Sequence, residues 1–313
     1  MKNVLITGGA GFVGGSLGTL LMGKGYKVRV FDNFFRGARP EETDQREVIE
    51  GDVLDLPALE RAVEGCCMVV HCAAIAGIDT VLKSPTTTLR VNLVGASNVL
   101  EASRRAGTVE RVLNFSTSEV FGNTAFGASE EDNAVTGSAG EARWCYAVSK
   151  LASEHLAQAY WQEHRLGTVT VRPFNVYGPG QVGEGALQIF IKRALRNQDL
   201  TIYGEGNQIR AWCYIDDFVR ALELVLESPD ALGESFNIGN ARAVVTIYGL
   251  ANTVIRVLDS RSKIVFEPRR SADIELRVPS VEKARQMLGF EARVDLEEGI
   301  VRTAEYYAKL LSS

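Results

Sequence analysis

Short apolar runs alternate with stretches of helical periodicity along the first half of the chain. The apolar runs predict strands at residues 4–6, 28–31, 48–50, 68–72, 111–116 and 169–171. The helical periodicity predicts helices at residues 12–23, 85–106 and 146–164. Strands that alternate with helices are typical of a doubly wound parallel sheet with right-handed crossovers. We therefore predict an α/β fold whose ligands bind beyond the carboxyl ends of the strands.

The pattern changes beyond residue 172. Residues 172–180 read as a loop, and further strands and helices are expected at residues 200–203 and 235–238 and at residues 186–197, 281–288 and 296–311. We predict a sheet domain over residues 1–172 and a smaller interleaved lobe over residues 173–313, with segments near residues 205–242 returning to the first domain.

A glycine-rich turn, residues 8–14, follows the first predicted strand and opens the first predicted helix. Its spaced glycines, Gly8, Gly11 and Gly14, let the backbone approach a pyrophosphate that the helix N-terminus can bind. The turn indicates a Rossmann-type dinucleotide site. The alternative is a structural turn with a helix cap.

Acidic residues at the next two strand ends extend this hypothesis. Asp32 ends the second strand, and its carboxylate can accept hydrogen bonds from the ribose diol of adenosine. It would repel a 2′-phosphate, so NAD is favoured over NADP, although Arg36 could offset part of that repulsion. Asp52 and Val53 fit an adenine contact at the third strand.

Small side chains follow the fourth strand. Ala73, Ala74 and Ala76 would let a cofactor pass close to the backbone there. Packing between a helix and a strand is the structural alternative for these alanines.

Tyr146 and Lys150 lie four residues apart, so in a helix both side chains leave the same face. A fixed cation beside a phenol favours the phenolate, so we expect the pKa of Tyr146 to fall and the residue to act as a base. Thr117, Ser118 and Glu119 end the fifth strand and offer two hydroxyls and a carboxylate to a sugar hydroxyl, or else form a helix cap.

Composition narrows the class of protein. The net charge of −5 gives no reason to expect nucleic acid or an anionic membrane as a partner. No apolar run reaches the ~18 residues that span a bilayer, and the chain becomes glycine-rich too soon for a secretory signal, so we expect a cytoplasmic protein. The five cysteines form no CxxC pair, and we expect no metal site.

Five ordered motifs make the whole chain similar to the extended short-chain dehydrogenases/reductases that act as NAD-dependent nucleotide-sugar epimerases, dehydratases and decarboxylases. The motifs are residues 7–14, 116–122, 146–150, 172–179 and 210–217. The resemblance implies that tightly held NAD takes hydride from C4 of the sugar. Tyr146 would be the base, Lys150 would lower its pKa and bind the nicotinamide ribose, and Thr117 or Ser118 would bond the 4-oxygen.

The resemblance also implies binding contacts. Phe12, Val13, Asn33 and Asn92 would join the glycines, Asp32 and the alanines around NAD. Asn175 and Arg210 would bind the diphosphate of a nucleotide-diphosphate sugar. A homodimer would form through the helices predicted at residues 85–106 and 146–164.

The fate of the C4 ketone separates three reactions: 4-epimerisation, loss of water and loss of CO2. A carboxylate at position 119 is similar to what dehydratases and uronate decarboxylases carry there, whereas simple 4-epimerases carry a small residue at this position. Ser118 stands where many dehydratases have aspartate, and Arg277 resembles an arginine that faces the substrate carboxylate in decarboxylases. Residues 178–181 lack the arginine that is common after Gly-Pro in decarboxylases.

We rank a UDP-sugar 4-epimerase first, then a UDP-glucuronate-type decarboxylase, then a 4,6-dehydratase. A non-catalytic dinucleotide sensor on the same fold is the alternative from another class, and the Tyr146–Lys150 pair argues against it. An NADPH-dependent reductase is disfavoured by Asp32.

Overall fold

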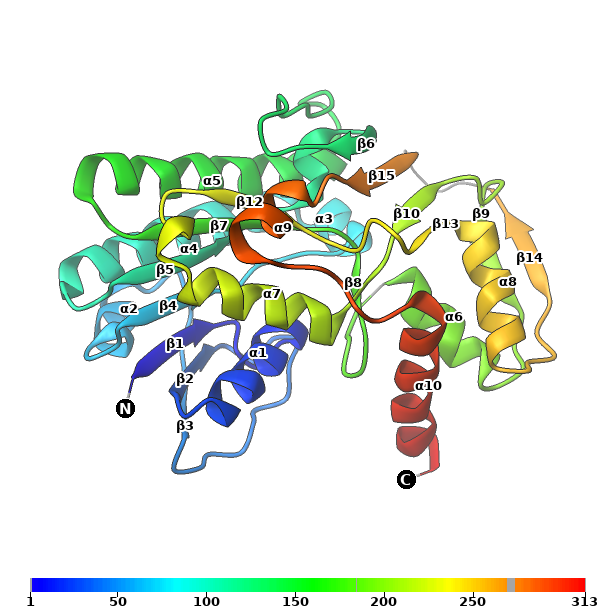
Figure 1. Cartoon of the computed structure of the whole chain (residues 1–313), viewed down its shortest axis with the longest axis horizontal. Helices are drawn as coiled ribbons and strands as arrows, with labels where there is room; N and C mark the ends of the chain where they lie inside the picture. Colours follow the sequence, from blue (N-terminus) through cyan, green and yellow to red (C-terminus); the bar gives the residue numbers. More distant parts are fainter. Residues whose placement is uncertain (1, 184, 269–273, 313) are drawn as a thin grey trace.

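The computed structural model describes residues 2–183, 185–268 and 274–312. A parallel sheet of seven strands lies at its centre, in the order β12-β7-β5-β4-β1-β2-β3 (Figure 1). These strands are β1 Asn3–Thr7, β2 Lys27–Asp32, β3 Arg46–Glu50, β4 Met68–His71, β5 Arg111–Phe115, β7 Thr168–Pro173 and β12 Ser235–Ile238. The predicted doubly wound α/β class is confirmed.

Helices cover both faces of this sheet. On one face lie α2 (Leu56–Val63), α4 (Pro85–Ala106) and α5 (Cys145–His164), and on the other α1 (Phe12–Gly23), α7 (Ile215–Glu227) and α9 (Glu282–Leu288) (Figure 1). Val4 and Ile6 of β1 pack with Leu17 of α1, whereas Leu5 packs with Leu59 and the α4 side. Strands buried on both faces are apolar at nearly every position, which is why the sequence pattern located them.

A second group of elements lies beyond the carboxyl ends of the main strands. It holds a four-stranded sheet in the order β13-β10-β15-β6, two strand pairs, and three helices that pack together. The elements are β6 Thr124–Ala128, β10 Ile209–Ala211, β13 Val244–Thr246 and β15 Leu276–Pro279, β8 Val176–Tyr177 with β11 Cys213–Tyr214, β9 Leu200–Tyr203 with β14 Ile264–Glu267, and α6 Ala186–Ala194, α8 Ile247–Val257 and α10 Leu296–Ser312. Short helices are α3 Ile78–Lys83, η1 Ser118–Phe121, η2 Ala142–Trp144 and η3 Pro229–Ala231.

Two predictions in the second half need correction. The stretch 172–180 is not all loop, because Val176–Tyr177 pairs with β11. The helix predicted at residues 186–197 ends at Ala194, and Asn197 has a φ of 53°. The domain division at residue 172 stays a prediction, and β12 is a strand from beyond that point that lies in the main sheet.

None of the described helices is long and apolar enough to cross a membrane.

Candidate active site

The glycine-rich turn joins β1 to α1 with no room for side chains. Gly8 has a φ of 69°, and a Cβ placed there would lie 2.6 Å from the Ala73 nitrogen. A Cβ on Gly14 would lie 2.5 Å from the Gly8 oxygen. Gly11 is the N-cap of α1, and no side chain of the described residues caps this helix, so the amides of its first turn remain available to an anion. That turn also contains the predicted contacts Phe12 and Val13. The turn fits the pyrophosphate of a dinucleotide.

Asp32 lies at the end of β2, directly beside this turn. Its carboxylate accepts hydrogen bonds from the Ala10 amide at 3.0 Å and the Phe34 amide at 2.8 Å. These bonds fix the carboxylate between the first two strand ends, where an adenosine ribose would lie. The side chain of the neighbouring Asn33 accepts a bond from the Phe35 amide at 3.1 Å.

Asp52 and Val53 follow β3. The Asp52 carboxylate accepts a bond from the Leu54 amide at 2.9 Å. Val53 is buried beneath α4, where a Cβ on Gly95 would lie 2.7 Å from it. Asp52 and Val53 therefore lie just beyond the carboxyl end of β3, and their contact with adenine stays a prediction.

Asn92 of α4 holds the loop that follows β4. Its side chain accepts a bond from the Ile75 amide at 2.8 Å and donates to the Ile75 carbonyl at 3.0 Å and to the Ser149 hydroxyl at 3.1 Å. Ser149 in turn donates to the Tyr146 carbonyl at 2.7 Å. Asn92 thus ties the loop carrying the predicted alanines to the helix carrying Tyr146, and direct contact of Asn92 with NAD stays a prediction.

Lys150 lies one turn beyond Tyr146 on α5, in dry surroundings. It is 2% exposed, and burial lowers its pKa to about 8, an effect that the Cys72 thiol opposes. Burial and the Lys150 charge lower the pKa of His71, at the end of β4, to about 3. The Thr7 hydroxyl and the His71 Nδ1 are 2.8 Å apart. Lys150 is therefore a cation at neutral pH above a neutral imidazole.

The expected fall in the pKa of Tyr146 is wrong for the chain alone, because the pKa is raised. Burial is the largest cause and the Glu119 carboxylate adds to it, whereas a hydrogen bond with Thr117 and the charge of Arg277 lower the pKa. The expectation rested on Lys150 alone, whereas burial and the Glu119 carboxylate outweigh the hydrogen bond of Thr117 and the charge of Arg277.

The strand-end triplet and the tyrosine are brought together. Thr117 hydrogen-bonds Tyr146, and its hydroxyl also accepts a bond from the Glu119 amide at 3.2 Å. Thr117 is in addition the N-cap of η1, which confirms the cap interpretation, and hydrogen bonding of the triplet to a sugar hydroxyl stays a prediction. Ser118 is buried in the first turn of η1.

Two buried arginines face Glu119 from different elements. Arg277 Nη1 of β15 lies 3.8 Å from one carboxylate oxygen, and Arg143 Nη2 of η2 lies 4.0 Å from the other. The arginine side chains are 7% and 5% exposed. The Nε of Arg143 is buried without a hydrogen-bond partner among the described residues. Sequence reasoning missed Arg143, although it lies three residues before Tyr146, a spacing that puts two side chains on one helical face.

Asn175 and Arg210 lie near one another on the β10 side of the site. Asn175 has a φ of 38° and donates to the Ala211 carbonyl at 2.9 Å. Arg210 is directly opposite Arg277 in the parallel pair of β10 and β15, so both side chains leave the same face of that sheet. The Arg210 guanidinium donates to the Ile209 and Ile274 carbonyls.

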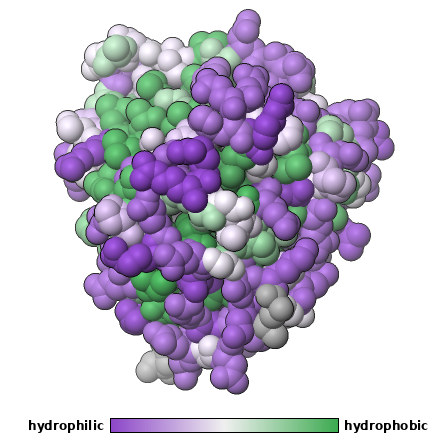
Figure 2. Space-filling model, turned by 90° about the vertical axis from the view of Figure 1, so that its left-hand side faces the viewer, coloured by the Kyte–Doolittle hydropathy of each residue, from purple (hydrophilic) through white to green (hydrophobic). Residues whose placement is uncertain are grey.

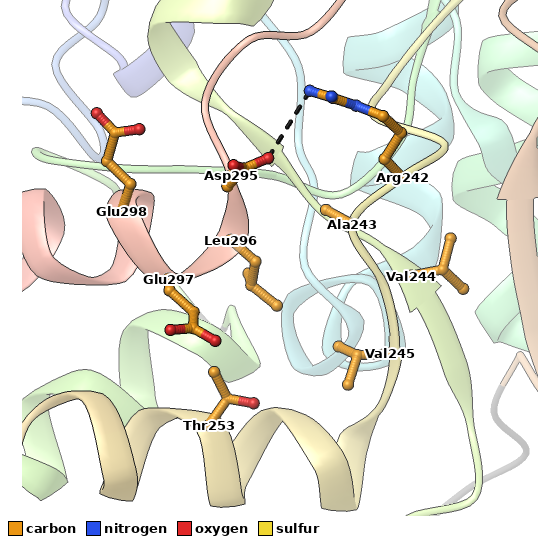
Figure 3. Close-up of a pocket in the computed structure, with 9 residues that line it drawn as sticks. All are labelled: Arg242, Ala243, Val244, Val245, Thr253, Asp295, Leu296, Glu297 and Glu298. Atoms are coloured by element: carbon orange, nitrogen blue, oxygen red, sulfur yellow. Dashed lines mark ion pairs between the residues drawn. The ribbon is translucent and has the colours of Figure 1, made fainter.

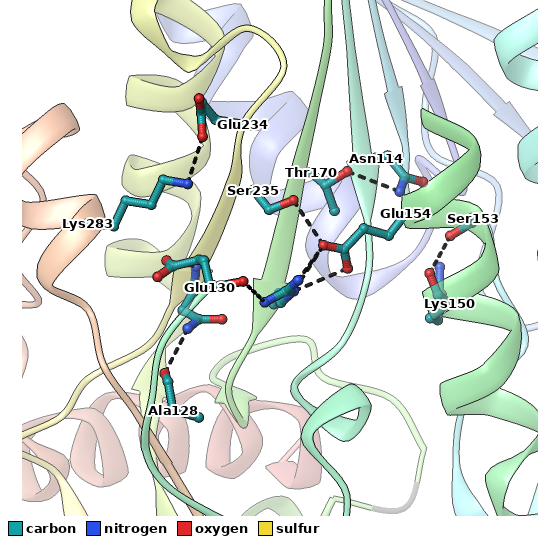
Figure 4. A network of polar contacts seen from close by, with 12 residues as sticks. Asn114, Ala128, Glu130, Lys150, Ser153, Glu154, Thr170, Glu234, Ser235 and Lys283 are labelled. Carbon is teal, nitrogen blue, oxygen red and sulfur yellow. Dashed lines mark hydrogen bonds and ion pairs between the residues drawn. The ribbon is translucent and has the colours of Figure 1, made fainter. Parts of the chain in front are cut away.

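A buried polar network anchors α5 to the main sheet (Figure 4). Glu154, one turn beyond Lys150, accepts a bond from Arg172 of β7 at 2.7 Å and from the Ser235 hydroxyl of β12 at 2.9 Å. Burial raises the pKa of Glu154, but the bonds and charge of Arg172 outweigh it, so the pKa is lowered. The ionised pair fixes the helix that carries Tyr146 and Lys150 against two strands.

A cavity of about 620 Å³ lies elsewhere, between β13, α8 and the start of α10 (Figure 3). The Arg242–Asp295 ion pair, 3.7 Å long, spans its rim, and none of the predicted site residues lines it. The described residues contain no group of three or more metal-ligating side chains.

The fold and these groups define a dinucleotide-dependent enzyme of the short-chain dehydrogenase/reductase type. The chain belongs to the NAD dependent epimerase/dehydratase family, whose model matches residues 4–239. As a member of this family it uses NAD, and the glycine-rich turn and Asp32 are shaped for that cofactor.

Relatives and solved structures span several reactions. UDP-N-acetyl-alpha-D-glucosaminuronate decarboxylase from Bacillus cytotoxicus is 33% identical over 99% of this chain and 98% of its own length. UDP-glucose 4-epimerase from Thermotoga maritima, solved with UDP-glucose, has a TM-score of 0.92 at 31% identity and covers 99% of this chain and 100% of its own. UDP-glucuronic acid 4-epimerase from Bacillus cereus, solved with UDP-glucuronic acid and NAD, has a TM-score of 0.90 at 28% identity with the same coverage.

Proposed function

We propose that this protein decarboxylates a UDP-linked hexuronate through a ketone at C4 of the sugar. The observation that carries the proposal is Arg143, a buried cation that reaches Glu119 only at 4.0 Å and has an Nε without a hydrogen-bond partner among the described residues. A buried guanidinium requires an anion that accepts its hydrogen bonds. The C6 carboxylate of a uronate would supply one beside Tyr146, with Arg277 on its other side.

The chain's own residues support each proton step. Held at the glycine-rich turn, NAD would supply the hydride acceptor for oxidation at C4 and the hydride donor for the final reduction. Tyr146 accepts the proton of the 4-hydroxyl, and Thr117, already bonded to the phenol, holds the same oxygen. Burial and Glu119 raise the pKa of the phenol, whereas Thr117 and Arg277 lower it. Lys150, one helical turn away, would add a second cation that favours the phenolate.

The ketone then makes the bond between C5 and C6 labile. CO2 leaves, the bonding electron pair forms an enolate across C4 and C5, and a solvent-derived proton enters at C5. Glu119 is the acidic group placed to relay that proton.

Mass spectrometry of products from a UDP-sugar panel tests the proposal. UDP-glucuronate and UDP-N-acetylglucosaminuronate should lose CO2, and deuterium from D2O should appear at C5. Arg143→Ala should lower kcat/KM for the uronate by about ten- to a hundred-fold, the scale of a hydrogen bond to a charged group. It should leave the affinity for UDP-glucose, whose sugar carries no carboxylate, unchanged. Arg256→Ala, which removes an exposed partner of Glu297, is the surface control. Uronates that remain intact would overturn decarboxylation.

A UDP-sugar 4-epimerase is the second candidate, supported by the likeness to the Thermotoga maritima structure. Sequence reasoning ranked it first, and the position of Arg143 moves decarboxylation ahead of it. Epimerisation would change the sugar without changing its mass, and a 4,6-dehydratase would release water instead.

We also propose that Asn175 and Arg210 bind the diphosphate and that the enzyme works as a cytoplasmic homodimer. Leu93 and Val94 of α4 and Val148 of α5 are exposed, at 37–42%. Figure 2 shows apolar side chains gathered on part of the face that it presents. Pairing of α4 and α5 with their copies would bury these side chains, and analytical ultracentrifugation would detect the dimer.

A further inference from the structure

Arg36 connects two loops that flank the glycine-rich turn. In the sheet, β1 lies between β4 and β2, and all three strands are parallel. The loops that follow β2 and β4 therefore stand on either side of the turn that follows β1. A bond from one of these loops to the other therefore bridges the two sides of the turn at which we expect the pyrophosphate of NAD to bind.

The Arg36 guanidinium makes that connection. From the loop after β2, its Nη2 donates to the Ala76 carbonyl at 2.6 Å and to the Thr80 hydroxyl of α3 at 2.9 Å. The base of the same loop is seated on the glycine-rich turn, because a Cβ on Gly37 would lie 2.3 Å from the Ala10 oxygen. The loop, the guanidinium and its two anchors form a closed ring over the cleft.

The positive charge of Arg36 is suited to the pyrophosphate of NAD that the neighbouring turn is expected to bind. Both anchors of Arg36 are neutral oxygens, and no ion pair joins Arg36 to a carboxylate of the described residues. The exposed Arg36 cation is therefore held beside the turn that we expect to bind the pyrophosphate, without a carboxylate partner among the described residues. Because it reaches toward β4, it points away from Asp32 at the end of β2. We therefore do not assign it to a 2′-phosphate.

We propose that Arg36 is a latch that retains NAD: it must release Ala76 and Thr80 before the cofactor can leave. The latch is independent of whether the enzyme decarboxylates or epimerises its substrate. Its role is in the rate of NAD dissociation, and the substrate chemistry has no part in it.

The experiment measures release of radiolabelled NAD from the loaded full-length enzyme after a chase with excess unlabelled NAD. Arg36→Ala should accelerate release about ten-fold or more, because it removes two hydrogen bonds of a charged donor. Thr80→Val, which keeps the cation and removes one anchor, should accelerate release by a smaller factor. Arg46→Ala is the matched control, since it removes a guanidinium that donates to the Glu41 carbonyl at the amino end of β3, away from the carboxyl strand ends that carry the glycine-rich turn.

The outcomes are distinct. Faster release from both Arg36→Ala and Thr80→Val, with the wild-type rate in Arg46→Ala, supports the latch. A wild-type rate in Arg36→Ala overturns it. Faster release from Arg36→Ala with a wild-type rate in Thr80→Val also overturns it, because the cation would then act through its charge alone. Equal acceleration in Arg46→Ala would show that loss of any surface cation is sufficient, and it too would overturn the proposal.

Discussion

The cofactor end and the substrate end of the candidate site are formed in different ways, the first mainly by backbone and the second by side chains. At the cofactor end, the backbone of the glycine-rich turn and the first turn of α1 leaves no room for a Cβ on Gly8 or Gly14, and the Asp32 carboxylate lies beside it. At the substrate end, Arg143, Arg277 and Glu119 converge from three separate elements. A backbone site is encoded in a few consecutive residues, whereas a side-chain site exists only after the whole chain has folded. The backbone site for the cofactor is common to many enzymes, whereas the side-chain site for the substrate decides which reaction follows.

The largest expected effect concerns the substrate end alone. Tyr146→Phe removes one hydroxyl and should lower turnover by about 10²- to 10⁴-fold, the usual contribution of a positioned acid or base. Bound NAD, measured by its absorbance after denaturation, should remain at the wild-type level. Tyr160→Phe makes the same chemical change on the same helix, where the phenol donates to Glu101 at 3.1 Å, and should retain activity. Loss of NAD in Tyr146→Phe would show that the two ends are not separable.

The second effect concerns the cofactor end. Gly14→Ala puts a methyl group 2.5 Å from the Gly8 oxygen, so it should lower the free energy of unfolding by up to about 3 kcal/mol and reduce bound NAD. Gly23→Ala is the matched control, because it lies in the same helix with no atom of the described residues within 4 Å of the new Cβ. That variant should gain up to about 1 kcal/mol in helix propensity. Equal behaviour in chemical denaturation would refute the close-packed turn.

The smallest effect concerns His71, which lies beneath both ends. Its folded pKa of about 3 is below the ordinary 6.5, so as pH falls below 6.5 the unfolded chain binds a proton that the folded chain does not. Stability is complete above pH 6.5, and at pH 5 the group should cost about 2 kcal/mol. Thermal melts between pH 7 and pH 5 should show a shallower loss in His71→Asn, whereas His155→Asn, at an exposed position, should follow the wild type. Parallel curves for all three proteins would contradict the buried, neutral imidazole.

Hydrophobic periodicity and glycine spacing were sufficient to predict the main sheet and the glycine-rich turn. The helix Pro85–Ala106 and the strand Leu200–Tyr203 have the bounds that periodicity predicted, and Tyr146 and Lys150 share a helical face as their spacing required. Such features depend on residues that are close in sequence.

The misses share a different cause. The strand Val176–Tyr177 forms only because β11 lies beside it, and Arg143 gains meaning only when Glu119 and Arg277 are folded around it. The direction of the Tyr146 pKa was wrong because burial and the Glu119 charge are properties of the folded site. Short sequence patterns do not record how dry a group is or which charges approach from distant strands.

The hydrogen bonds by which Asn92 holds the loop after β4 affect how sequences in this family can vary. Its bonds to residue 75 go to the backbone amide and carbonyl, which every residue except proline provides. The side chain at position 75 can therefore be exchanged while the anchoring is kept, whereas Asn92→Asp would lose the donors and Asn92→Leu would lose every bond. Evolution or protein design can therefore change the side chain at position 75 while the loop after β4 stays anchored to α4.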